Sequence, residues 1–222
     1  MTVTDVNVVK SAIFERPDDA NKGTLGSLLC VCGSYGMAGA AVMSAKGALR
    51  TGIGLAKCAL PRSIYPIVAQ TILESVYYPL SENADGRISK VNVPFLVSES
   101  CKSSATLVGC GLGVCDDTLK IVFSLIENST TPLVLDADAL NCVAKQPEIL
   151  LRKKAPIIIT PHPGEMSRLT GLATPLVNAE RERVALDFAQ KYGVVTVLKG
   201  AGTVIACLLY TSPSPRDTER SR

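Results

Sequence analysis

Short apolar runs of strand length alternate along this chain with stretches of helical pattern. Most of these runs are nearly continuous in apolar residues instead of alternating with polar ones. Continuous apolar runs are typical of strands covered on both faces, and their alternation with helices is typical of a parallel sheet. The expected strands are 28–32, 54–59, 105–108, 132–135, 157–160, 194–198 and 203–206. We therefore predict one α/β domain built on a mostly parallel, doubly wound sheet.

Two helices are the clearest between these strands. Residues 179–192 have Asn178 as a candidate N-cap, acidic residues in the first turn and Gly193 after the last turn. The face expected to lie on the sheet carries Val184, Phe188 and Tyr192. Residues 40–49 are rich in strong helix formers and predict the second helix.

The composition argues against several classes of protein. The formal net charge is only +3 and the basic residues are scattered, so we expect no nucleic-acid partner. No apolar stretch has the length of a membrane span, and the first residues lack the pattern of a secretory signal, so we expect a cytoplasmic protein. The eight cysteines show no C-x-x-C pair and no zinc spacing. We expect them to be reduced and mostly packed as small apolar side chains.

The end of the chain differs in character from the rest. Residues 207–222 change abruptly to a composition rich in Ser, Pro and Arg, which resembles translated adapter or vector sequence. We therefore predict that the domain comprises residues 1–206 and that residues 207–222 are a non-native tail.

Two glycine-rich segments follow expected strands. Ligands of an open α/β sheet bind beyond the carboxyl ends of its strands, where glycines let backbone N–H groups approach an anion. Residues 33–39 fit this role, although a tight turn also explains them. Residues 109–113, with Asp136 further along, resemble a dinucleotide-binding fingerprint. Val114 stands where that fingerprint needs its third glycine, so an NAD-dependent dehydrogenase ranks third among the hypotheses.

Two carboxylates stand where the strand 132–135 is expected to end. Asp138 is explained by an N-cap role at the start of a helix. Asp136 is expected to point from the carboxyl edge of the sheet toward a ligand, although turn chemistry also accounts for it.

The only histidine and one lysine also follow expected strands. His162 lies between two prolines that fix its backbone, and we favour ligand contact over simple packing for its ring. Lys199 begins the segment 199–203, whose glycines fit a hairpin turn. Its charge at a strand end predicts a contact with phosphate.

Six separated motifs, in this order, resemble those of the NAD(P)H-hydrate dehydratases. They are residues 21–26, 36–41, 109–113, 135–141, 160–166 and 198–206. The most specific are T-P-H-P-G-E at 160–165 and K-G-x-x-T-V-I-A at 199–206. The resemblance covers residues 20–206 and implies a ribokinase-like fold, a three-layer α/β/α sandwich that is incomplete at its C-terminus.

The resemblance also implies an activity. The family's enzymes are lyases that repair NADH or NADPH whose nicotinamide ring has taken up water. The form of the T-P-H-P-G-E motif, and a chain without an attached epimerase domain, favour the bacterial, ADP-dependent branch. That branch acts on the S form of the hydrate and releases AMP and phosphate. The implied cofactors are ADP and Mg²⁺, and the implied assembly is a homotetramer.

Roles for individual residues follow from the same resemblance. The positions that match contacts with the hydrated nucleotide are Ala40, Gly111 and His162. The positions that match the adenine-nucleotide loop are Lys199, Gly200, Ala201, Gly202 and Thr203. Asp136 and Asn141 are supporting candidates, and no residue is assigned as a metal ligand.

The sequence departs from the family pattern after Ala206. Family members continue with a G-x-G-D turn that enters a helix and supplies an anion hole and the catalytic aspartate. These 222 residues contain no G-x-G-D sequence, so the catalytic residue is unassigned. We expect the chain to bind nucleotide weakly and to catalyse almost no dehydration. Missing cover over the sheet would also make it prone to aggregate.

Two alternative functions remain open. A ribokinase-like kinase of vitamins or sugars would use the same nucleotide edge but would leave a phosphorylated acceptor. A non-catalytic nucleotide-binding remnant would keep the pocket without the chemistry. Analysis of the products distinguishes the first alternative from a dehydratase, and a downstream in-frame G-x-G-D would argue against the second.

Overall fold

A computed structural model describes residues 23–207 and contains one eight-stranded sheet. The strand order is β3-β2-β1-β4-β5-β6-β7-β8, in which only the last pair, β7 with β8, is antiparallel. The strands are β1 (Ser27–Val31), β2 (Leu55–Pro61), β3 (Val76–Leu80), β4 (Ala105–Val108), β5 (Leu133–Leu135), β6 (Ile157–Ile159), β7 (Val195–Leu198) and β8 (Val204–Ala206). The predicted α/β class with a mostly parallel sheet is confirmed.

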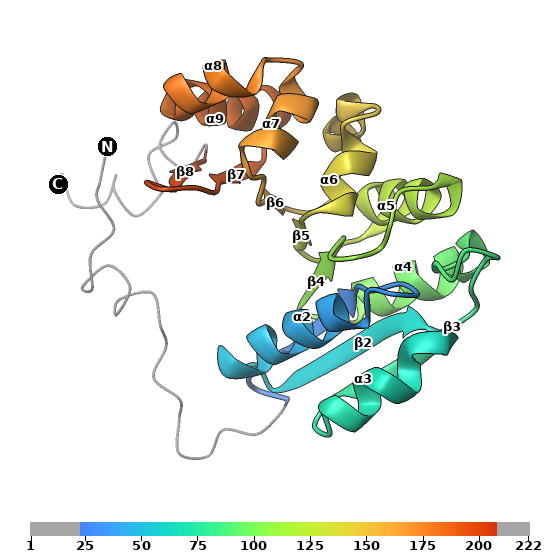
Figure 1. Ribbon diagram of the computed structural model, residues 1–222. Coiled ribbons are helices and arrows are strands. Elements are labelled where there is room, and N and C mark those ends of the chain that lie inside the picture. Colours follow the sequence, from blue (N-terminus) through green and yellow to red (C-terminus); the bar gives the residue numbers. More distant parts are fainter. Residues whose placement is uncertain (1–22, 208–222) are drawn as a thin grey trace, which may run out of the picture.

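Helices connect the parallel strands within the described part of the chain. They are α2 (Ala38–Arg50), α3 (Tyr65–Thr71), α4 (Val93–Cys101), α5 (Asp116–Asn128), α6 (Asp138–Val143), α7 (Pro163–Thr170), α8 (Thr174–Ala179) and α9 (Arg181–Tyr192). Three short 3-10 turns accompany them at η1 (Arg62–Ile64), η2 (Lys90–Asn92) and η3 (Pro147–Arg152). Figure 1 shows α2 and α3 beside β2 at one end of the sheet, and α7 to α9 at the other.

Alternate residues of β1 belong to two separate cores. Leu29 and Val31 join the larger core, which α4 to α9 complete. Cys30 belongs to a smaller core that α2 and α3 cover. Because successive side chains of a strand point to opposite faces, the two cores lie on the two sides of the sheet. The prediction that both faces are covered is therefore confirmed for β1 and β2.

The α2 side of the sheet carries a row of apolar side chains beyond β1. Leu107 pairs with Val134, Val134 with Ile158, and Ile158 with Val195 in adjacent strands. The last three side chains are partly exposed in the described part of the chain, and Ile205 of β8 is 62% exposed. The expectation of cover on both faces is therefore wrong for β5 to β7 within residues 23–207.

We predict that the 222-residue chain binds the dye 8-anilinonaphthalene-1-sulfonate in its native state, because this row forms a connected apolar surface. Replacing Ile205, the most exposed member, with threonine should lower the dye fluorescence and the light scattering of concentrated samples. Leu73→Thr, which changes an exposed leucine outside the row, is the matched control. Equal fluorescence changes in both variants would contradict the prediction.

Several expectations about single elements need correction. The helix expected over 179–192 is confirmed as α9, Arg181–Tyr192, but its N-cap residue is Glu180, because Asn178 lies inside α8, which ends at Ala179. The apolar face of α9 is buried as expected. β3 was not expected from the sequence. Among the described residues no helix has the length and apolar character needed to cross a membrane. Residues 208–222 of the expected tail lie outside the described residues.

Candidate nucleotide-binding rim

The loops that follow β1, β4, β5, β6 and β7 meet at one edge of the sheet. These five strands are parallel neighbours, so their carboxyl ends lie on the same side. Backbone hydrogen bonds link the loops directly: Gly33 donates to the carbonyl of Cys110 at 2.8 Å, and Lys199 donates to that of Pro161 at 2.8 Å. We call this edge, with its loops 33–39, 109–114, 136–138, 160–162 and 199–203, the carboxyl rim.

The loop after β4 lies against the start of α2. Gly111 has a φ of +68°, and a Cβ at this position would come within 2.7 Å of the Cβ of Ala40. The hydroxyl of Ser34 fixes the loop by donating to the carbonyl of Gly111 at 2.8 Å. The structure thus brings together two residues assigned from the family resemblance, Ala40 and Gly111. The structure also assigns a contact to Ser34, which lies in the glycine-rich segment 33–39 but had no predicted role.

The N-terminus of α2 is suited to an anion. The N-cap residue Met37 makes no side-chain capping bond, and the first turn contains no acidic residue. The positive end of the helix dipole therefore faces the rim without compensation by a side chain. Ala40 lies in this first turn. The arrangement supports a phosphate of a dinucleotide between the start of α2 and the loop at Gly111.

Asp136 and Lys199 form an ion pair that links two loops of the rim. The Lys199 ammonium donates to Asp136 Oδ1 at 2.7 Å across 63 positions of sequence. Burial raises the pKa of Asp136, but hydrogen bonds from Lys199 and Thr160 and the charge of Lys199 outweigh it. The pKa of Asp136 therefore lies below its usual value. The two loops are held together at neutral pH, with a cation available for a phosphate.

The Asp136→Asn substitution tests this ion pair. The pKa of Asp136 is lower in the folded protein. The stabilisation that the ion pair gives the folded protein is therefore complete above the pKa of Asp136 in the unfolded chain, about 3.9. It is lost as the pH falls through the pKa of Asp136 in the folded protein. At neutral pH we expect the free energy of unfolding of the wild type to exceed that of the variant by about 1 kcal/mol. The difference is this small because Lys199 is partly exposed, and exposed ion pairs contribute little to stability. Urea unfolding at several pH values should show the difference shrinking below pH about 4. A difference that grows with acidity would contradict this.

The segment 199–203 is the predicted hairpin turn between β7 and β8. Arg181, the first residue of α9, donates from one guanidinium nitrogen to the carbonyls of Leu198 at 2.8 Å and Lys199 at 3.0 Å. A Cβ at Gly200 would lie 2.9 Å from the same nitrogen, so the guanidinium packs directly on the turn. Arg181 was not identified from the sequence, where it looks like an ordinary charged residue of a helix.

Replacing Arg181 with alanine should loosen the 199–203 turn. Two charge-assisted hydrogen bonds to its backbone would be lost, at a cost of about 1–2 kcal/mol in stability. Hydrogen exchange of the amides of residues 200–203 should accelerate by roughly tenfold, while amides of α2 stay unchanged. Arg183→Ala, which removes an exposed guanidinium one half-turn along the same helix, is the control. Unchanged exchange in the turn of the Arg181 variant would contradict the assigned role.

His162 has a structural function that the sequence analysis did not assign. It is the N-cap residue of α7, where Nδ1 accepts hydrogen bonds from the backbone N–H groups of Gly164 at 3.0 Å and Glu165 at 3.3 Å. The carboxylate of Glu165 accepts from the backbone N–H of His162 at 2.8 Å, completing a capping box. Nε2 therefore carries the proton when the ring is neutral. Nε2 lies 3.4 Å from Glu165 Oε1, while 51% of the side chain stays exposed at the rim.

Asp138 does not cap a helix as expected. It is the first residue of α6, and its carboxylate accepts from the N–H of Gly113 at 2.8 Å and from the amide of Asn141 at 3.2 Å. The amide oxygen of Asn141 in turn accepts from Arg168 at 2.8 Å. Asn141, a supporting candidate, thus belongs to a series of side-chain hydrogen bonds that fixes the loop at Gly113. The N-cap position belongs to Ala137, which has an unusual φ of +51°.

A resident metal ion does not fit the described residues. They contain no group of three or more His, Cys, Asp or Glu side chains that could hold one. At the rim, both oxygens of Asp136 have partners, Lys199 at 2.7 Å and the Cys110 thiol at 3.8 Å.

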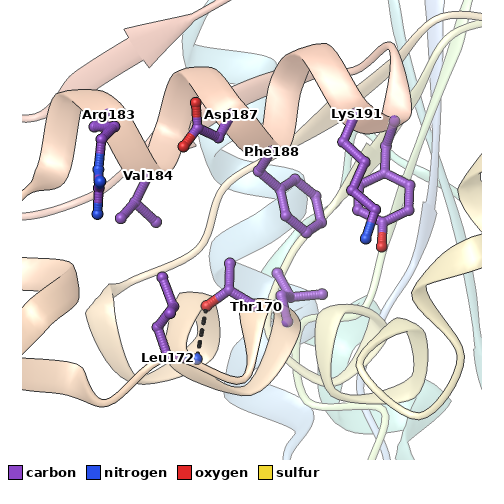
Figure 2. Close-up of a pocket in the computed structure, with 9 residues that line it drawn as sticks. Thr170, Leu172, Arg183, Val184, Asp187, Phe188 and Lys191 are labelled. Atoms are coloured by element: carbon purple, nitrogen blue, oxygen red, sulfur yellow. Dashed lines mark hydrogen bonds between the residues drawn. The ribbon is translucent and has the colours of Figure 1, made fainter.

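A separate pocket of about 210 Å³ lies away from the rim, between α7 and α9 (Figure 2). Its floor is apolar and its edges are charged. The lining residues are Leu169, Thr170, Leu172, Arg183, Val184, Asp187, Phe188, Lys191 and Tyr192. Sites for drug-sized ligands usually measure roughly 300–1,000 Å³, so this pocket is too small for a dinucleotide. The candidate site is therefore the open rim.

Comparison with known proteins places this rim in a family. A family model described as NAD(P)H-hydrate dehydratase matches residues 28–208, which include every loop of the rim. The chain belongs to the NAD(P)H-hydrate dehydratase family. The family resemblance inferred from the six motifs is therefore confirmed.

Curated relatives carry the same name. The bifunctional NAD(P)H-hydrate repair enzyme Nnr of Thermofilum pendens is 39% identical over 191 residues, which are 86% of this chain and 36% of that protein. The ADP-dependent (S)-NAD(P)H-hydrate dehydratase of Neisseria meningitidis is 31% identical over 194 residues, 86% of this chain and 61% of that protein. The chain thus spans little more than a third of the bifunctional relatives that it matches.

Solved structures agree on the fold. The ADP/ATP-dependent NAD(P)H-hydrate dehydratase of Bacillus subtilis, co-crystallised with ATP and Mg²⁺, is 29% identical with a TM-score of 0.74. The match covers 90% of this chain and 67% of that one. A ribokinase-like superfamily protein of Enterococcus faecalis, 20% identical over 88% of this chain and 65% of its own, has a TM-score of 0.73 and supports the fold alone. The predicted ribokinase-like fold is confirmed.

Proposed function

We propose that this chain forms the substrate-binding rim of an ADP-dependent (S)-NAD(P)H-hydrate dehydratase. The observation that carries the proposal is the ion pair between Asp136 and Lys199, which joins the loops next to Gly111 to the 199–203 turn on a single edge. Two nucleotides must meet in this reaction, and the two groups of family-assigned residues lie on loops of the same carboxyl rim. The names of the relatives from N. meningitidis and B. subtilis support the same activity.

The proposed reaction explains why a nucleotide is consumed. Hydroxide is a poor leaving group, so transfer of a phosphoryl group from ADP to the hydrate's hydroxyl converts it into phosphate, which leaves readily. AMP, phosphate and the intact NADH or NADPH are the products. Positioning and charge stabilisation dominate such transfers. In this proposal the start of α2 and the loop at Gly111 hold the hydrate, and Lys199 with residues 200–203 holds ADP.

The finer features are proposals of the same kind. Mg²⁺ is proposed to enter bound to the phosphates of the nucleotide, because such ions need few protein ligands. His162 is proposed to contact the hydrate through Nε2. A homotetramer is proposed from the family resemblance, whereas a cytoplasmic location and the absence of nucleic-acid and membrane partners are proposed from the charge and the apolar pattern of the sequence.

A fused protein tests the proposal. Residues 1–206 would be joined to the segment that follows the aligned position in the N. meningitidis dehydratase, and recovery of NADH absorbance from hydrated NADH would be followed. We expect recovery that requires ADP and yields AMP and phosphate. The 222-residue chain alone should bind ADP weakly in calorimetry and show recovery close to the uncatalysed rate.

The outcomes separate the alternatives. A phosphorylated alcohol among the products, without hydrate-dependent phosphate release, would identify a small-molecule kinase instead. A fused protein that binds ADP but produces neither product would identify a non-catalytic remnant. Rapid ADP-dependent recovery by the 222-residue chain itself would overturn the expectation that these residues lack the catalytic carboxylate.

A further inference from the structure

Two cysteines face each other at the carboxyl ends of β1 and β4. Cys32 follows β1 directly, and Cys110 follows Gly109 at the end of β4. Gly109 donates to the carbonyl of Val31 at 3.2 Å and Gly33 donates to that of Cys110 at 2.8 Å, so the two bonds bracket Cys32. Cys32 belongs to the smaller core and Cys110 packs against it, so both side chains lie on the α2 side of the sheet.

The two thiols have different surroundings. Cys32 is 1% exposed, whereas Cys110 is only partly buried and its Sγ lies 3.8 Å from Asp136 Oδ2. The hydrogen bond from Cys32 lowers the pKa of Cys110 to about 7, although burial and the charge of Asp136 act in the opposite direction. The same hydrogen bond, together with burial, raises the pKa of Cys32. Cys110 is thus the more reactive thiol, and Cys32 is its protonated neighbour.

We propose that Cys110 and Cys32 form a peroxide-sensitive pair, in which Cys110 is oxidised first and Cys32 then closes an intramolecular disulfide. The oxidant is hydrogen peroxide or an organic hydroperoxide, and neither the family nor the dehydration reaction requires this chemistry. It is carried by adjacency: the partly exposed Cys110 and the buried Cys32 follow neighbouring parallel strands, and backbone hydrogen bonds on either side of Cys32 hold the two loops together. The proposal stands independently of the proposed dehydratase activity.

One molecule of hydrogen peroxide supplies the oxidising equivalents for both steps, formation of the sulfenic acid and formation of the disulfide. The Cys110 thiolate attacks one peroxide oxygen, the O–O bond breaks, and the departing hydroxide takes a proton to leave as water. Cys110 then carries a sulfenic acid. The sulfur of Cys32 attacks the sulfur of Cys110, the S–O bond breaks, and the Cys32 proton leaves with the hydroxide as a second water. Two thiols lose two electrons in total, and one peroxide is reduced to two waters.

The position of the pair links it to the rim. Cys110 immediately precedes Gly111, and its thiol contacts Asp136, the partner of Lys199. A disulfide to Cys32 withdraws Sγ from Asp136 and fixes the loop 109–114 against β1. Oxidation therefore acts on the loops that the proposed function assigns to both nucleotides.

Mass spectrometry of the peroxide-treated 222-residue chain tests the pair directly. Digestion without reducing agent should give a Cys32–Cys110 cross-linked peptide as the main oxidation product. In Cys32→Ser, which removes the second thiol, dimedone should instead trap a sulfenic acid at Cys110. Cys110→Ser should yield neither product. Circular dichroism checks that each variant is folded. The cross-linked peptide from the wild-type chain is a test that does not depend on the folding of any variant.

Matched controls address two of the other accessible thiols. Cys101→Ser changes the exposed cysteine, and Cys115→Ser changes the cysteine at the N-cap of α5. Both variants should form the Cys32–Cys110 disulfide at the wild-type rate. At neutral pH, iodoacetamide should modify Cys110 roughly tenfold faster than free glutathione, since about half of a thiol with a pKa near 7 is ionised. Oxidation that starts at Cys101 or Cys115 and leaves Cys110 and Cys32 unlinked would overturn the proposal.

Discussion

Replacing Gly109 with alanine is expected to cost on the order of 4 kcal/mol in free energy of unfolding, a large fraction of the stability of an ordinary domain. Gly109 has a φ of +127°, which an L side chain rarely adopts. A Cβ here would lie 1.8 Å from the carbonyl oxygen of Asp136 and 2.8 Å from the backbone nitrogen of Ala139. Because both neighbours are backbone atoms at the start of α6, the clash cannot be relieved by a rotamer change.

Urea and thermal unfolding measure this effect. We expect a loss of roughly 8–16 °C in Tm for a chain of this size, or failure to fold at ambient temperature. Gly47→Ala is the matched control, since Gly47 lies in α2 with nothing within 4 Å of an added Cβ. That variant should gain about 0.5–1 kcal/mol, because alanine is the better helix former. A Gly109 variant as stable as wild type would show that the loop after β4 can rearrange freely.

The fold was largely predictable because the sheet is parallel and buried. Strands such as β4, β5 and β6 read as short apolar runs, and helices between them force the parallel arrangement. β3 was missed because its sequence, Val76–Leu80, contains two tyrosines and Pro79. Proline is tolerated there because β3 is an edge strand, a fact that depends on the strand order.

The location of the carboxyl rim could be predicted from the sequence, but the hydrogen bonds between its side chains and loops could not. Glycine-rich and polar segments at strand ends had to meet once the strands were parallel, so Gly111, Asp136 and Lys199 could be proposed together. The hydrogen bonds of Arg181 depend on the exact placement of α9 over β7, which no local pattern encodes. The capping function of His162 was missed because histidine is not among the usual N-cap residues.

The start of α9 was predicted to within two residues, but its N-cap residue, Glu180, was not. Residues 174–192 keep a helical pattern almost without interruption, and neither glycine nor proline marks the break at Glu180. Glu180 adopts a φ of −123° and a ψ of +39°, outside the helical region. The break places Arg181 at the start of α9, under the 199–203 turn, so tertiary contacts with the rim override the local helical preference.

Replacing Lys199 with alanine is expected to weaken ADP binding by roughly 10- to 100-fold, the range for losing a hydrogen bond to a charged group. Lys199 is the cation at the end of β7, 42% exposed and held in place by Asp136. Its removal takes a positive charge from the proposed phosphate site and also leaves Asp136 as an unpaired negative charge facing the phosphates. Both effects oppose binding of the same anion.

Calorimetry of ADP binding by the fused protein measures the loss, and two variants separate its causes. Lys154→Ala removes an exposed lysine just before β6, at the opposite edge of the sheet, and should leave the dissociation constant within about twofold of wild type. The double variant Lys199→Ala with Asp136→Asn should recover part of the affinity, because it removes the repulsion but not the missing contact. The rim assignment fails if Lys199→Ala binds ADP as tightly as Lys154→Ala, since the cation at the end of β7 would then lie outside the nucleotide site.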